Sequence, residues 1–301
     1  MKTQQVAGSY FKTIKALLTL TVMLVFLTGY CQVTTTGNNG NGNGNGNGGV
    51  GNGNGKGNNK PGKSDNNTPL VTGLRYSDLS TANTLLTVPT GYGSTGSYLF
   101  GDAGGTPRQA YGSVPDMVAH FGFGLGNYRK VLSLSAFVSV NDVSKFGNLS
   151  YNVIASRALG KTTSVSVGAL HQYADPVVSD GLASYYVSFS HHTKAERSAG
   201  NPVLDYTFGY GNGKFLEKSI YDYETGKGSR GTGFFGSLSY AVIKQARINA
   251  EWNGMNLAVT SSLVLKRNLP HVFFGVADLT RYTGNKPVVL FGIGQTLGLG
   301  H

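Results

Sequence analysis

The chain has 301 residues, a charged fraction of only 13%, 45 glycines and one cysteine. The body beyond residue 68 carries 19 basic and 13 acidic residues, a net charge of +6 that is scattered along the sequence; this excludes a nucleic-acid-binding protein, which needs a clustered basic stripe. A single cysteine excludes an intramolecular disulfide and a thiolate metal site. No motif in the sequence indicates a cofactor or another metal site, and we expect neither.

Residues 1–31 have the form of an export signal. Three lysines precede an apolar run at 16–27, which is shorter than the ~20 residues of a comfortable transmembrane helix. We favour cleavage after Cys31, which leaves Gln32 as the new N-terminus. Acylation of Cys31 in a lipoprotein is the alternative, and Tyr30 disfavours it because a small residue normally stands at that position.

Residues 32–68 consist mainly of Gly and Asn with a few Lys. Such a segment cannot bury enough apolar surface to offset its ordering entropy, so we predict a disordered linker. Residues 69–96 are predicted to be an extended lead-in, in which 85–89 either pairs with a sheet edge or lies in the mouth of the body. Residues 97–301 then form the β-domain.

The β-domain is built from segments in which apolar and polar side chains alternate, as on the two faces of a strand. The pattern is clearest at 246–252, and Asn253-Gly254 after it predicts a two-residue hairpin turn before the pattern resumes at Met255. We predict twelve strands: 97–102, 117–125, 131–140, 148–157, 163–173, 183–191, 203–211, 233–242, 245–252, 255–264, 271–278 and 288–297.

The polar faces of these strands carry mainly Ser, Gly, Thr and Asn, whereas the solvent face of a soluble sandwich usually carries Lys, Glu and Arg. Short and long connections largely alternate, and aromatic side chains lie towards strand ends, as in membrane barrels. We therefore predict an all-β fold: an antiparallel up-and-down transmembrane β-barrel of about 12 strands. The alternative is an exported β-sandwich, an adhesin or binding module on a flexible stalk.

Several motifs strengthen the barrel prediction. They are Pro89-Thr-Gly-Tyr-Gly93, Phe121-Gly-Phe-Gly-Leu-Gly-Asn127, Phe235-Gly-Ser-Leu238, Glu251-Trp-Asn-Gly-Met-Asn-Leu257 and Val276-Ala-Asp-Leu279. Together they resemble an uncharacterised family of outer-membrane β-barrel proteins of cyanobacterial type, over roughly residues 85–299. The resemblance implies an outer-membrane location and contact with the lipid bilayer and the outer-membrane assembly machinery. It supplies no catalytic residues.

Five polar side chains are candidates for the barrel lumen: Arg247, Glu251, Asp205, His120 and Gln172. They could form a constriction that screens solutes by size and charge, with small anionic solutes or envelope components as partners. They could equally form an internal network that fills the lumen. The sequence leaves both readings open, so the predicted function is a narrow pore or a structural envelope protein.

The connection at 212–231 is the candidate for external recognition, with Phe215, Tyr221 and Tyr223 as anchors. A barrel lipid hydrolase is a weaker alternative. It would require His171 to face lipid, in register with the apolar residues of its strand, beside a serine. We predict that the protein is not an enzyme.

Overall fold

The computed structural model describes residues 85–109, 115–174, 182–193, 204–243, 245–264, 270–280, 282–284 and 286–299. The predicted signal peptide and linker lie outside the described residues, as do Cys31 and Gln32. Among the described residues, no helix is both long and apolar enough to cross a membrane.

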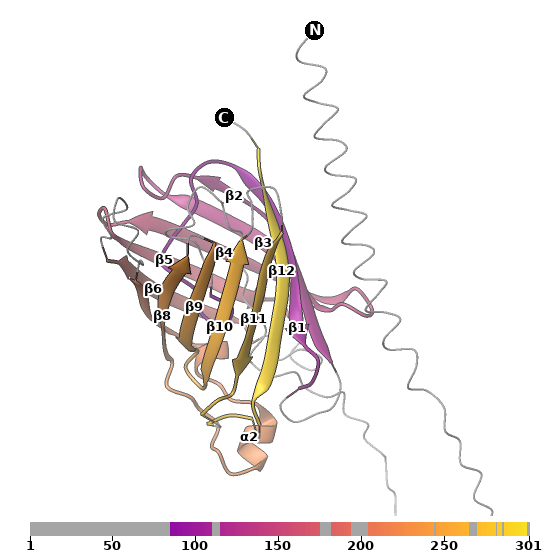
Figure 1. Cartoon of the computed structure of the whole chain (residues 1–301). Coiled ribbons are helices and arrows are strands. Elements are labelled where there is room, and N and C mark those ends of the chain that lie inside the picture. The colour runs from indigo at the N-terminus through magenta and orange to yellow at the C-terminus, as the bar shows by residue number, and fades with distance from the viewer. Residues whose placement is uncertain are drawn as a thin grey trace, which may run out of the picture. The chain divides into compact units, whose positions relative to one another are not determined.

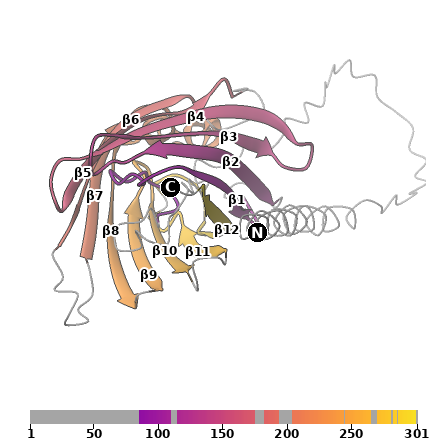
Figure 2. The same cartoon turned by 90° about the horizontal axis from the view of Figure 1, so that it is seen from above.

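Twelve antiparallel strands form one closed barrel in which each strand pairs with its sequence neighbours and β1 pairs with β12 (Figures 1 and 2). The strands are β1 (Tyr98–Thr106), β2 (Asp116–Gly126), β3 (Ser133–Asp142), β4 (Gly147–Ala158), β5 (Thr163–Gln172), β6 (Ser184–His192), β7 (Leu204–Gly211), β8 (Phe234–Ile243), β9 (Ala246–Trp252), β10 (Leu257–Val264), β11 (His271–Ala277) and β12 (Val288–Gly298). The predicted barrel and its twelve strands are confirmed. The alternative β-sandwich is wrong, because all twelve strands belong to one closed sheet and the described residues contain no second sheet for it to pack against.

The strands point most of their polar side chains into the barrel and expose many apolar ones outside, while a smaller set of apolar side chains, such as Phe137, Tyr186 and Phe235, also lies inside. On β9, Arg247, Asn249 and Glu251 are buried, whereas Ile248 and Ala250 between them are exposed. The outer surface carries large apolar side chains around the whole barrel, among them Leu99, Phe123, Leu134, Val153, Val167, Phe189, Phe208, Leu238, Val259, Phe274 and Val289. Soluble monomers rarely expose so extensive an apolar surface, and such a band is typical of a barrel that faces lipid.

The two ends of the barrel differ in the length of their connections. One end carries the links 127–132, 159–162, 193–203, 244–245 and 265–270, together with the start of β1 and the end of β12; we call it the short-link end. The other end carries 107–115, 143–146, 173–183, 212–233, 253–256 and 278–287; we call it the long-link end. The longest connection, 212–233, contains a 3-10 helix, η4 (Gly213–Phe215), and a short helix, α2 (Ile220–Glu224).

Residues 85–94, which we call the lumen segment, lie inside the barrel (Figure 2). Residues 85–92 are all buried, and their backbone bonds to inward-facing side chains of β6 and β9. At the short-link end, the segment turns into β1 through a bridge between Thr95 and Asn127. Of the two positions considered for 85–89, the structure does not show pairing with a sheet edge; Leu86 and Thr87 lie at the long-link end of the lumen, and the chain continues within it.

Two local predictions were wrong. The turn after β9 is a four-residue link in which the Asn253 side-chain oxygen accepts bonds from the backbone N–H groups of Met255 and Asn256, at 3.0 and 2.7 Å. Gly254 takes a φ of +95° there, and Met255 is buried within the link. On β5, Tyr151 pairs with Gln172 but Val153 pairs with Ala169, which marks a β-bulge at Leu170 and His171. The bulge shifts the alternation of side chains by one residue.

Candidate pore lumen

At the long-link end, the lumen segment is held by the carboxylate of Glu251. Glu251 is the penultimate residue of β9 and is 0% exposed. Its oxygens accept bonds from the backbone N–H of Leu86 at 3.2 Å, the backbone N–H of Thr87 at 2.7 Å and the Thr87 hydroxyl at 2.8 Å. The hydroxyl of Thr260 on β10 donates a further bond. One inward-pointing acid therefore satisfies two backbone donors that the lumen segment would otherwise bury unpaired.

Nearer the short-link end, the segment is held by hydroxyl groups and by close packing. The N–H of Gly91 donates to the Ser190 hydroxyl of β6 at 2.7 Å, and the Ser166 hydroxyl of β5 donates to the Thr90 carbonyl at 2.8 Å. A Cβ atom on Gly91 would lie 2.6 Å from the carbonyl oxygen of Ser164 and 2.9 Å from the nitrogen of Ser190. Only glycine allows the segment to lie this close to the wall.

A second glycine lets the segment leave the lumen beside the wall. A Cβ atom on Gly93 would approach the Cβ atoms of Ser156 and Tyr128 to 2.8 Å. Directly after it, the Ser94 carbonyl accepts a bond from the Tyr128 N–H at 3.1 Å. The motif Pro89-Thr-Gly-Tyr-Gly93 thus fits the lumen segment against β4, β5 and β6.

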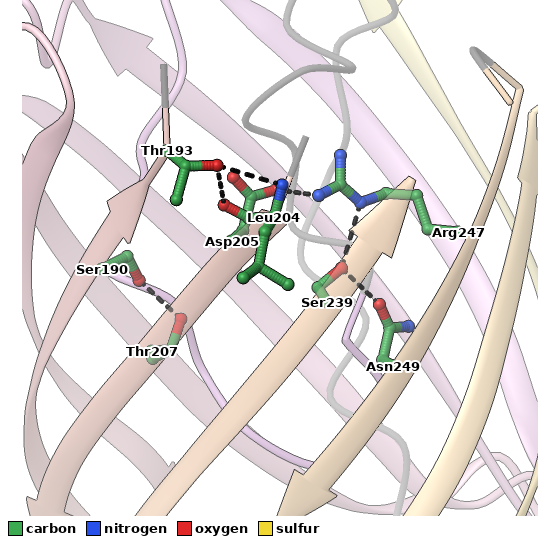
Figure 3. A network of polar contacts seen from close by, with 8 residues as sticks. All are labelled: Ser190, Thr193, Leu204, Asp205, Thr207, Ser239, Arg247 and Asn249. Carbon is green, nitrogen blue, oxygen red and sulfur yellow. Dashed lines mark hydrogen bonds and ion pairs between the residues drawn. The ribbon is translucent and has the colours of Figure 1, made fainter. Parts of the chain in front are cut away.

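A polar network links β6, β7, β8 and β9 across the inner wall (Figure 3). The Arg247 guanidinium forms an ion pair with the Asp205 carboxylate, and its Nε donates to the Ser239 hydroxyl at 3.0 Å. The hydroxyls of Ser190 and Thr207 are 2.7 Å apart in the same wall. Both charges are buried and paired, so they add little net charge to the lumen.

A second pair of buried ionisable side chains, Asp102 and His120, lies on the opposite wall. Asp102 of β1 and His120 of β2 face each other in register, and the Asp102 oxygen lies 2.6 Å from Nδ1 of His120. The His120 ring packs edge-on against Phe137, with the ring centroids 5.7 Å apart. Arg247, Glu251, Asp205 and His120 therefore all point into the barrel.

Gln172 does not join these four residues. Because of the bulge, its side chain faces outward and its carbonyl oxygen accepts a bond at 3.1 Å from the hydroxyl of Tyr185, which is 58% exposed. His171 takes the inner position, at a φ of +53°, with its ring 3.5 Å from the Ser150 hydroxyl. The expected orientations of both residues were wrong. His171 therefore does not lie at the lipid face, where a lipid hydrolase would need it.

The 212–233 connection folds back against the barrel at the long-link end. Phe215 is 0% exposed and stacks on Phe235, with the ring centroids 4.4 Å apart. It was predicted to be an exposed anchor, and this is wrong because η4 turns its ring towards the aromatic side chains of β6 and β8. Tyr223 is 67% exposed and Tyr221 is half-buried, so these two remain accessible at the surface.

The same fold buries Lys214, which precedes Phe215. Its N–H donates to the Ser184 hydroxyl at 2.8 Å, and its ammonium lies 5.6 Å from the Phe215 ring centre. Burial lowers the pKa of Lys214 to about 8. Within the described residues, no cluster of His, Cys, Asp or Glu side chains is arranged to hold a metal ion.

No family model matches the sequence, and no curated protein is significantly similar to it. Solved structures with similar architecture include the KdgM porin in complex with disordered oligogalacturonate, at 11% identity and a TM-score of 0.41 over 67% of this chain and 99% of that one. An outer membrane channel from Pseudomonas putida F1 has 10% identity and a TM-score of 0.41, over 68% and 97%. Outer membrane phospholipase A from Escherichia coli has 12% identity and a TM-score of 0.35, over 76% and 98%.

Proposed function

We propose that the protein is an outer-membrane β-barrel that forms a narrow pore, and that the lumen segment restricts this pore. The closed barrel with apolar side chains outside and Ser, Thr and Asn inside supports a membrane location, because every backbone group of a closed sheet is paired without water. The observation that carries the restriction is the set of bonds from Leu86 and Thr87 to Glu251 within the lumen. Twelve strands lie between the eight-stranded barrels whose interior side chains fill and the sixteen-stranded porins that leave a wide channel, so a chain inside the lumen narrows the path that remains beside it.

The charged residues of the wall suggest which solutes pass. Arg247 is neutralised by Asp205, so the wall near them discriminates weakly by charge. The net charge of +6 on the body favours small anionic solutes at the two mouths. We therefore expect a small conductance with a slight preference for anions.

Conductance in a planar lipid bilayer tests the proposal. The full-length protein should give a small single-channel current, and Glu251→Ala should raise the current at least several-fold, because the segment loses its acceptor at the long-link end. Ser262→Ala is the matched control: it removes a buried hydroxyl from the same wall of β10 without altering Glu251. Arg247→Ala should shift the reversal potential towards cations, because Asp205 is left unneutralised.

The folded state of each variant is checked by its change of gel mobility on boiling in detergent. Folded wild type and folded Glu251→Ala that both carry no current would overturn the pore. The protein would then be a structural component of the envelope, and the lumen segment would block its lumen permanently.

A further inference from the structure

Four basic side chains lie on neighbouring strands and links at the short-link end. All four are exposed, and we call them the basic patch: Arg129, Lys130, Arg157 and Lys161. The first two lie in the link between β2 and β3, the third is the penultimate residue of β4, and the fourth lies in the link between β4 and β5. Residues 127–132 and 157–162 contain no Asp or Glu, so the local charge of these two stretches is positive.

The backbone brings the two stretches together. The N–H of Ala158 donates to the carbonyl oxygen of Tyr128 at 2.8 Å, which joins the end of β4 to the link between β2 and β3. Within that link, the side-chain oxygen of Asn127 accepts bonds from the N–H groups of Arg129 and Lys130, at 3.0 and 3.3 Å. The Nε of Arg129 donates to the Tyr128 hydroxyl at 3.1 Å. Arg129 is therefore held in position before a ligand arrives, which lowers the entropy cost of binding.

The basic patch stands at the edge of the lipid-facing surface. The side chains of β4 that point outward are those of Leu149, Tyr151, Val153, Ala155 and Arg157. Charge thus appears only at the last outward position, where the hydrocarbon layer ends and a long cationic side chain can reach the polar layer. Val131, Leu132 and Leu159 of the two links are 69%, 46% and 59% exposed. Apolar and cationic side chains therefore alternate at this level, as on a surface that meets both acyl chains and head groups.

Basic side chains at the long-link end are arranged differently. The connection 212–233 contains four basic and three acidic residues, so its charges nearly cancel. Lys145 forms an ion pair with Asp142 at 3.4 Å. Lys218 is buried, and its ammonium donates to the carbonyl oxygens of two neighbouring residues in these connections. Among the described connections, the short-link end is therefore where basic residues stand without acidic residues close to them in the sequence.

We propose that the basic patch binds the phosphate groups of anionic phospholipids in the leaflet on the short-link side of the membrane. Bacterial barrels have short turns on the periplasmic side, so this is the periplasmic leaflet. Guanidinium and ammonium groups both bind phosphate oxygens, and Arg can donate two parallel bonds. An anionic lipid fits the patch better than a zwitterionic one, whose own cation is repelled by these four side chains. The proposal rests on the membrane barrel but is independent of whether solutes pass through it.

Native mass spectrometry of the full-length protein, folded in a non-ionic detergent, tests the proposal. Phosphatidylglycerol and phosphatidylcholine with the same acyl chains are added in equal amounts, and the ratio of the two lipids that the protein retains is measured. The test variant combines Arg129→Gln, Lys130→Gln, Arg157→Gln and Lys161→Gln. The matched control removes the same charge at the long-link end by combining Arg108→Gln, Lys145→Gln, Arg230→Gln and Lys286→Gln. Gel mobility before and after boiling shows that each protein is folded.

Wild type and the control should prefer phosphatidylglycerol, and the test variant should lose about ten-fold of that preference. Salt at about 1 M should weaken the preference of wild type, because it screens charges beyond a few ångströms. Inorganic phosphate should not displace the lipid, because it has no acyl chains to lie against the apolar side chains of the patch.

Equal preferences in the test variant and the control would overturn the proposal, as would a folded wild type that retains both lipids equally. Displacement of phosphatidylglycerol by inorganic phosphate would also overturn it, because the patch would then be a site for a free anion. The measurement requires a folded barrel but no current, so failure of the pore and failure of the lipid site can be told apart.

Discussion

The two ends of the lumen segment are attached to the barrel by different physical means. At the long-link end, one buried carboxylate, Glu251, collects two backbone N–H groups and a hydroxyl from the segment. At the short-link end, neutral hydroxyls of Ser190 and Ser166 make single bonds, and glycine brings the backbone against the wall. Hydrogen bonds to a charged group are about twice as strong as neutral ones. The strongest bonds between the segment and the barrel are therefore at the long-link end, and the closest backbone packing is near the short-link end.

The largest expected effect comes from the charged end. Glu251→Ala leaves two buried backbone donors and two hydroxyls without their acceptor, which costs about 3 kcal/mol or more of unfolding free energy. Ser190→Ala removes one neutral bond and should cost about 1 kcal/mol. Urea unfolding of the barrel in lipid vesicles, followed by fluorescence of the single tryptophan, measures both. Equal losses for the two variants would contradict the difference between the ends.

A smaller effect is expected from the close fit. Gly91→Ala forces a Cβ atom against backbone atoms of β5 and β6, and overpacking of this kind costs about 1–3 kcal/mol. The segment should then be displaced from the wall near Ser190, and a protease should cut it faster while the barrel stays intact. Gly160→Ala is the control, because no atom lies near its Cβ position. Unchanged proteolysis of Gly91→Ala would mean that the segment is not packed this tightly.

The smallest effect concerns Lys214 beside the long-link end of the lumen. Burial lowers its pKa to about 8 in the folded protein, so between pH 8 and its unfolded value the unfolded chain binds more protons. The cost of burying the charge is fully present below pH 8 and is relieved as the pH rises. Stability should therefore increase by about 1 kcal/mol between pH 7 and pH 9. Unfolding of wild type and Lys214→Met at both pH values measures this increase, which the variant should lack.

The sequence predicted the closed barrel and its twelve strands correctly. Period-two alternation fixes which side chains share a face, so the strands and the inward direction of Arg247, Glu251 and Asp205 follow from local pattern alone. Alternation gave the wrong side-chain orientations for His171 and Gln172, because a β-bulge shifts the pattern by one residue and no local signal in the sequence marks the bulge. It failed at Phe215 because the ring packs on Phe235, a contact between segments that alternation does not describe.

The sequence alone determined the number of strands and the chemistry of their two faces. Both depend only on the alternation of neighbouring residues, in which apolar side chains face lipid and polar side chains face the lumen. The path of residues 85–94 was decided only by the tertiary structure. Leu85 and Leu86 have the composition of an ordinary buried strand, and nothing beside Leu86 indicates that its N–H bonds to an acid 165 residues away. Closure of the barrel brings that partner into place, because it surrounds residues 85–94 with inward-facing donors and acceptors that no open sheet would bring together.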